Sequence, residues 1–150
     1  MRRTHLFTLL FLAVIGLAFT APVHTRPAQD LKPASELALL MREMAVFMDS
    51  TRAHVVKGQD RLPYPEQFKK MRTATPTEGM VDHAVYDPFA DHFLASLDSF
   101  YKAKKKNRAQ AYNALVQACA NCHMQVCPGP LVRIKKMYVP LPEPIPVKGK

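Results

Sequence analysis

Residues 107–126, NRAQAYNALVQACANCHMQV, carry the clearest structural signal in this chain of 150 residues. Their apolar side chains recur three or four positions apart, which is the spacing of one face of an α-helix. Asn107 can begin such a helix, and the Pro-Gly-Pro sequence at residues 128–130 predicts where it ends. The apolar face comprises Tyr112, Leu115, Val116, Cys119, Cys122 or His123, and Val126. We therefore expect an amphipathic helix that packs against the rest of the chain.

This helix carries the sequence Cys119-Ala120-Asn121-Cys122-His123. The CxxCH pattern is typical of covalent c-type haem attachment, in which two thiols form thioethers with the porphyrin and the histidine binds iron. Cys119 and Cys122 lie about one helical turn apart, so both sulfurs can reach the two vinyl groups of one macrocycle. The motif predicts one haem c, with His123 as the proximal axial ligand.

Two other classes of site use the same residue types. Cys119, Cys122, His123 and Cys127 could form a structural zinc site, but four ligands on nine residues of one helix do not easily surround a tetrahedral ion. A thiol-disulfide pair normally begins a helix that follows a strand, whereas these cysteines come late in a helix. Cys127 is the odd thiol, and pairing with another chain and a free buried thiol both remain open for it.

The beginning of the chain predicts export. Met1-Arg2-Arg3 is a positively charged opening, and residues 6–19 are uncharged and mostly apolar, as in a secretory signal peptide. This run is shorter than the roughly 20 residues that span a bilayer, so we expect a signal over residues 1–20 and no stable membrane span after its removal. The cleavage site and an uncleaved anchor stay open. The protein is then periplasmic or otherwise exported, and residues 21–32 form a flexible leader.

The chain is basic, with a formal net charge of +9, which becomes +7 when Arg2 and Arg3 leave with the signal. Basic proteins bind nucleic acid, anionic membranes or acidic proteins, and export argues against nucleic acid. Four lysines and an arginine cluster between two predicted helices, where we expect an ordinary solvated connection. That cluster comprises Lys102, Lys104, Lys105, Lys106 and Arg108.

Helical spacing recurs in the body of the chain. Ser35 caps a predicted helix that runs to Gly58, a short helix is expected over residues 66–73, and Asp87-Pro88 predicts the start of another long helix. Residues 75–87 have no periodicity and are expected to be a long connection. No stretch alternates with period two, so we predict an all-α protein, an antiparallel four-helix bundle over residues 33–130. Residues 131–150 form a basic, Pro-rich tail.

An exported helical chain with its CxxCH at the end of the last helix resembles the class II c-type cytochromes, the cytochrome c-prime family. The resemblance covers about residues 33–130, and it implies a haem near one end of the bundle, between the first and last helices. The best-known class I cytochromes instead place CxxCH near the N-terminus, with a methionine ligand well downstream, whereas here only 27 residues follow His123. Dimers are common in the class II family, so the resemblance allows a homodimer.

The family divides by its second axial ligand, which is either a methionine from the first helix or an open site that binds diatomic gases. The apolar stripe of the first predicted helix contains Met41, Met44 and Met48. We favour Met44 as the distal ligand and keep Met41 as the alternative, because counting from the two ends of the helix gives different positions. Met137 ranks third, and we interpret His54 and His83 as surface or loop histidines.

A methionine on iron implies a periplasmic carrier of single electrons, and an open site implies a five-coordinate protein that binds NO or CO. The sequence identifies no catalytic set, so we predict a carrier that is not an enzyme. Its expected partners are redox proteins, and acidic ones would suit the basic chain.

Overall fold

The computed structural model describes residues 33–141, and within this range it contains helices, turns and loops but no β-strand. The prediction of an all-α protein is therefore confirmed. None of the helices in this range is both long and apolar enough to cross a membrane. The predicted signal over residues 1–20, the leader over 21–32 and the tail beyond residue 141 lie outside the described residues.

The first described helix, α2, spans Glu36–Val56, close to its predicted bounds. The Ser35 hydroxyl caps it by accepting a hydrogen bond from the Ala38 N–H at 3.2 Å, as the sequence suggested. The chain leaves the helix through Gly58, whose φ of 63° lies in the left-handed region that favours glycine. The buried face of α2 comprises Leu37, Leu40, Met44, Met48 and Thr51.

The segment after α2 forms a short 3-10 helix, η1, over Glu66–Arg72. Phe68 and Met71 are buried, which confirms the short helix and its inward face. The next long helix, α3, spans His83–Lys102 and begins earlier than the Asp87-Pro88 signal predicted. That prediction was wrong because Asp82 caps the helix, with its carboxylate accepting from the Ala84 N–H at 2.9 Å.

The early start of α3 also buries a large side chain. Tyr86 is 2% exposed and its hydroxyl donates to the Met71 carbonyl at 3.0 Å, which ties α3 to η1. Pro88 then falls inside the helix, on an exposed face near its beginning. Proline has no N–H, so α3 lacks one backbone hydrogen bond at Pro88. The buried contacts of Tyr86, in the turn that precedes Pro88, offset this loss.

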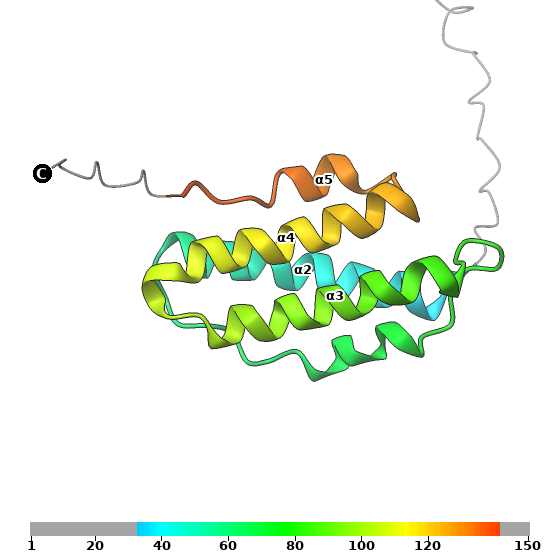
Figure 1. Cartoon of the computed structure of the whole chain (residues 1–150), viewed down its shortest axis with the longest axis horizontal. Coiled ribbons are helices and arrows are strands. Elements are labelled where there is room, and N and C mark those ends of the chain that lie inside the picture. Colours follow the sequence, from blue (N-terminus) through cyan, green and yellow to red (C-terminus); the bar gives the residue numbers. More distant parts are fainter. Residues whose placement is uncertain (1–32, 142–150) are drawn as a thin grey trace, which may run out of the picture. The chain divides into compact units, whose positions relative to one another are not determined.

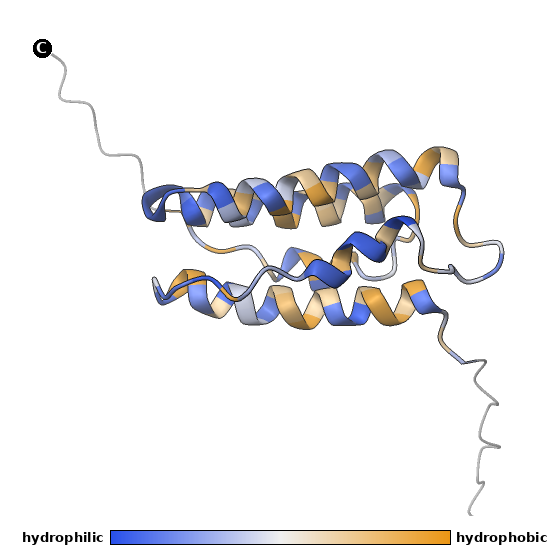
Figure 2. Ribbon diagram, turned by 90° about the horizontal axis from the view of Figure 1, so that it is seen from below, coloured by the Kyte–Doolittle hydropathy of each residue, from blue (hydrophilic) through white to orange (hydrophobic). Residues whose placement is uncertain are grey.

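A short 3-10 turn, η2 (Lys105–Asn107), reverses the chain into α4, which spans Arg108–Gln125 as the sequence predicted. Lys104, Lys105 and Lys106 are exposed in this connection as predicted. The prediction was wrong for Arg108, which is buried and donates to the Gln59 carbonyl at 2.6 Å. In Figure 1 α3 and α4 run side by side in opposite directions, and the N-terminal half of α2 lies near the last turns of α4. Hydrophobic and hydrophilic residues alternate along each helix in Figure 2, as expected for amphipathic helices that share a core.

Residues 131–139 form part of the fold, and we call them the C-terminal strap. The strap begins with a helical turn, α5 (Leu131–Lys135), which follows α4 in Figure 1. Its buried side chains are Ile134, Met137 and Val139. The predicted boundary at residue 130 was therefore too early, because the basic residues of this segment concealed its apolar side chains, which recur at every second or third position.

The strap is fastened to α4 by a pair of hydrogen bonds. The Asn113 side chain donates to the Val139 carbonyl at 2.8 Å and accepts from the Val139 N–H at 2.9 Å, so it pairs with the backbone as a neighbouring strand would. The Tyr138 hydroxyl also donates to Gln117 of α4 at 2.7 Å, and Arg133 pairs with Asp49 of α2 at 2.7 Å.

Candidate functional site

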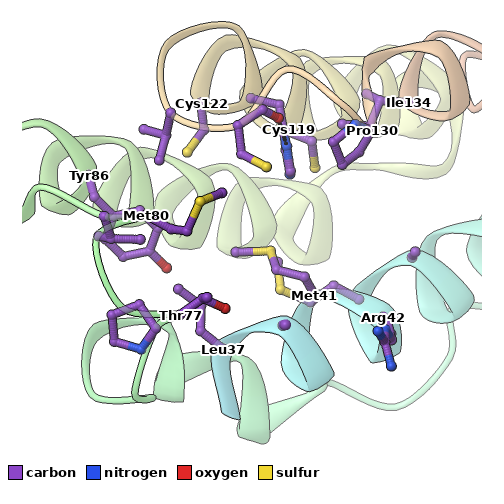
Figure 3. A pocket seen from close by; sticks show the side chains of 18 of the residues that line it. Leu37, Met41, Arg42, Thr77, Met80, Tyr86, Cys119, Cys122, Pro130 and Ile134 are labelled. Carbon is purple, nitrogen blue, oxygen red and sulfur yellow. Dashed lines mark hydrogen bonds between the residues drawn. The ribbon is translucent and has the colours of Figure 1, made fainter. Parts of the chain in front are cut away.

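A cavity of about 400 Å³ lies between the N-terminal half of α2, the last turns of α4, the loop over residues 73–82 and the C-terminal strap. Figure 3 shows it from close by, with the cysteine side chains of α4 above and the α2 side chains below. Cofactor and small-molecule sites in proteins enclose roughly 300–1,000 Å³ and are lined mostly by apolar groups. The volume and the largely apolar walls of this cavity fall within that class.

All five site residues predicted from the sequence line this one cavity. They are Met41, Met44, Cys119, Cys122 and His123. The antiparallel packing of α2 and α4 brings them together, and a buried hydrogen bond fixes its register: the Tyr112 hydroxyl donates to the Met48 carbonyl at 3.0 Å. His54 and His83 are not among the residues that line the cavity.

The ring of His123 is held in one tautomer. Its Nδ1 lies 2.8 Å from the Cys127 carbonyl oxygen. A carbonyl oxygen only accepts hydrogen bonds, so Nδ1 carries the proton and donates, and Nε2 of the neutral ring keeps its lone pair. Histidines that bind metals usually donate their other ring N–H in this way, which fixes the ring and raises its basicity as a ligand. Nε2 is therefore the ring nitrogen of His123 that this hydrogen bond leaves available.

The two thiols of the motif lie in the last turns of α4, three residues apart on the helix. Burial is the main cause that raises the pKa of Cys119 to about 12, and the neighbouring Cys122 thiol adds to it. Burial likewise raises the pKa of Cys122. Cys119, Cys122 and Cys127 are all free of disulfide bonds. Both motif thiols are thus protonated near neutral pH and face an apolar cavity.

These thiols do not match the two alternative sites. Thiol-disulfide catalysts depend on a lowered cysteine pKa, usually at a helix N-terminus, whereas here the pKa is raised and the helix is ending. Among residues 33–141, no three His, Cys, Asp or Glu side chains converge as a metal site of those ligands would need. The zinc interpretation therefore receives no geometric support from the described residues.

The methionines of α2 lie at different distances along the helix axis from His123. Tyr112 of α4 contacts Met48 of α2, and the two helices are antiparallel. His123, eleven residues after Tyr112, therefore lies beside the residue eleven positions before Met48, to within about one turn. That position is Leu37, which places Met41 about one turn and Met44 about two turns deeper than His123. Met44 is also 6% exposed in the core, whereas Met41 is only partly buried.

Two arginines stand among the residues that line the cavity. Arg42 of α2 is exposed and makes no ion pair with any other described residue. Arg133 of the strap pairs with Asp49. The cavity therefore combines apolar walls with one cationic side chain that has no ion pair among the described residues and a second that Asp49 already pairs, which suits a mostly apolar ligand with an acidic group.

The sequence missed several residues of this cavity. Met80 and Thr77 come from the loop over residues 73–82, and Ile134 comes from the strap, whereas Met137 of the strap was the third-ranked ligand candidate and does line the cavity. A loop methionine gives no periodic signal, so nothing in the sequence separated Met80 from its neighbours. The strap does carry a signal, the spacing of Leu131, Ile134 and Met137, but Arg133, Lys135 and Lys136 interrupt it.

The donor set fits a covalent haem. Two thiols on one helical turn can form the two thioethers, the hydrogen bond of His123 uses Nδ1 and leaves Nε2 available, and soft thioether sulfurs line the same cavity. No protein-family model matches this chain, and neither a curated protein nor a solved structure matches it.

Proposed function

We propose that this protein is an exported c-type cytochrome of the class II kind that it resembles, a carrier of single electrons. One observation carries the proposal: Cys119, Cys122, His123 and the α2 methionines line a single apolar cavity, and a hydrogen bond leaves Nε2 of His123 free. The bound haem would supply a reversible one-electron couple at its iron. The chain's own residues would attach it, orient it and exclude water from it.

We propose further that the helices form a four-helix bundle of the class II type. In this proposal α2, α3 and α4 are three of its helices, the short η1 stands in the place of the fourth, and the C-terminal strap is an addition. The haem would lie at the end of the bundle where α2 begins and α4 ends. The position of the cavity supports this arrangement, since it opens between these two helix ends.

In this proposal Cys119 and Cys122 hold the cofactor covalently, and His123 is the proximal ligand. The Cys127 carbonyl keeps the imidazole oriented by accepting from Nδ1. The free Cys127 thiol is then not needed for attachment, because the residue acts through its backbone. Arg42 and Arg133 would bind the acidic groups of the cofactor by charge-assisted hydrogen bonds.

A methionine of α2 would be the distal ligand. The sequence favoured Met44 over Met41, and the register of α2 against α4 favours Met41, which lies closer to the height of His123. His123 and this methionine would hold the bound haem from the chain, and the haem would then supply a one-electron couple that needs little rearrangement of the protein. The basic charge of the chain would suit an acidic redox partner in the periplasm.

Absorption spectra of the exported protein test this function. We expect sharp low-spin bands, a sulfur-to-iron charge-transfer band in the oxidised form and no response of the reduced form to carbon monoxide. The charge-transfer band identifies a thioether on the iron, and its loss in Met44→Leu would identify Met44 as that ligand in place of Met41. A high-spin spectrum that changes on adding carbon monoxide would instead identify a five-coordinate, gas-binding protein.

A further inference from the structure

The cavity also receives an exposed thioether from outside α2. Met80 lies in the loop over residues 73–82 and is 51% exposed, yet it is one of the residues that line the cavity. Figure 3 shows Met80 and Met41 reaching toward the middle of the cavity from opposite sides, both on the side that faces Cys119 and Cys122. Two flexible sulfur side chains from different elements thus share one space.

The loop that carries Met80 is tied to the first turn of α2. The Thr75 carbonyl accepts from the Leu37 N–H at 3.0 Å, and the Thr75 N–H donates to the Glu36 carboxylate at 2.9 Å. The Thr77 hydroxyl donates to the Ser35 hydroxyl at 3.1 Å. These three bonds hold the base of the loop beside the first turn of α2, between one and two turns before Met41.

A tight turn then directs Met80 into the cavity. Gly79 has a φ of 72°, in the left-handed region that favours glycine, and the Met80 N–H donates to the Thr77 carbonyl at 3.0 Å. The turn reverses the chain immediately before Met80. Its side chain therefore points back toward α2 and α4 although the loop backbone lies at the surface.

We infer that Met80 is a second distal ligand, which competes with Met41 for the coordination position opposite His123. The inference rests on the proposed haem attachment. An exchange breaks one iron–sulfur bond and forms another, with no change of oxidation state. Because either thioether occupies the position, loss of one methionine leaves the iron six-coordinate, and carbon monoxide gains free access only when both are absent.

The test uses the exported protein with its attached haem and four variants. They are Met41→Leu, Met80→Leu, the double variant, and Met124→Leu as a matched control on an exposed part of α4 that does not line the cavity. The measurements are the charge-transfer band of the oxidised form and the carbon monoxide affinity of the reduced form. Carbon monoxide binds only while no methionine occupies the coordination position, so its apparent affinity is the intrinsic affinity multiplied by the fraction of time that the position is free. If methionines occupy the position ~99% of the time, the apparent affinity falls about 100-fold.

Each single variant should keep the charge-transfer band and gain less than about tenfold in carbon monoxide affinity, whereas the double variant should lose the band and gain about 100-fold. The control should match the unmutated protein. Met41→Leu that binds carbon monoxide as tightly as the double variant would overturn the inference. A double variant that keeps the band would also overturn it, since another residue would then be the ligand.

Two further measurements keep the result interpretable if a variant fails to fold. In the unmutated, reduced protein labelled with ¹³C at the methionine methyls, the haem ring should shift the resonances of both Met41 and Met80. A shift of Met41 alone contradicts the inference. A pyridine haemochrome of the unmutated protein separates the two proposals. If the haemochrome spectrum is absent, the proposed haem function itself is wrong. If the spectrum is present and only the Met41 resonance is shifted, only the role of Met80 is wrong.

Discussion

Replacing Asn113 with alanine should release the C-terminal strap from α4. The side chain makes two hydrogen bonds to the Val139 backbone, at 2.8 and 2.9 Å, and Val139 is 5% exposed. Each bond contributes about 1 kcal/mol, and alanine regains about 0.5 kcal/mol through its higher helix propensity. The net loss is therefore about 1.5 kcal/mol of unfolding free energy, which lowers the Tm by roughly 6–10 °C for a domain of this size.

Thermal unfolding followed by circular dichroism measures this difference. Gln110→Ala is the matched control, because Gln110 is an exposed amide on the same helix with no side-chain hydrogen bond to a described residue. Its Tm should change by no more than about 2 °C, in line with the small effects of most surface substitutions. An Asn113→Ala variant with the Tm of the control would contradict the claim that the Asn113–Val139 hydrogen bonds hold the strap against α4 as a wall of the cavity.

Three other perturbations test the fold. A chain that stops after Pro130 loses three buried apolar side chains, worth roughly 1.5–3 kcal/mol each, and should be largely unfolded by circular dichroism, whereas a chain that keeps the strap and ends at residue 141 should still be folded. Leu97→Ala, at a position that is 0% exposed, should lower the unfolding free energy by about 2–5 kcal/mol in urea titrations, and a smaller loss would mean that the core collapses around the gap. The hydrogen bond from the Thr75 N–H lowers the pKa of the Glu36 carboxyl below its ordinary 4.5. The stability contributed by this bond is therefore complete above pH 4.5, and it is lost as the pH falls through the lower pKa of the folded protein. Tm measured between about pH 3 and pH 7 should therefore fall less steeply in Glu36→Gln, and equal slopes would contradict the assigned bond.

The sequence predicted the elements whose signals are local. Ser35 is a polar cap in front of a regular apolar stripe, and both the cap and the stripe lie where they were expected. In α4 Asn107 immediately precedes the helix, although its side chain makes no capping hydrogen bond, and most of the predicted apolar face is buried. The cavity follows from these two helices, because antiparallel packing places the beginning of one beside the end of the other.

What the sequence did not predict depends on contacts between distant segments. Asp87-Pro88 is a good start signal in isolation, but burial of Tyr86 against η1 stabilises an earlier turn. The strap has short apolar spacing among basic residues, and its position depends on Asn113, which lies 26 residues before its partner. Met80 enters the cavity through one glycine turn and through bonds to α2, and neither leaves a periodic pattern.

Covalent haem attachment at Cys119 and Cys122 is the central claim. Two measurements on the exported protein test it most directly, namely the mass of the denatured polypeptide and the pyridine haemochrome spectrum. We expect the mass to exceed that of the polypeptide by one haem, and we expect the haemochrome spectrum of a haem bound through two thioethers. The Cys119→Ser/Cys122→Ser double variant should carry no covalent haem, whereas Cys127→Ser should retain it. A polypeptide of unmodified mass, from cells that attach haem to a control cytochrome c, would contradict the account.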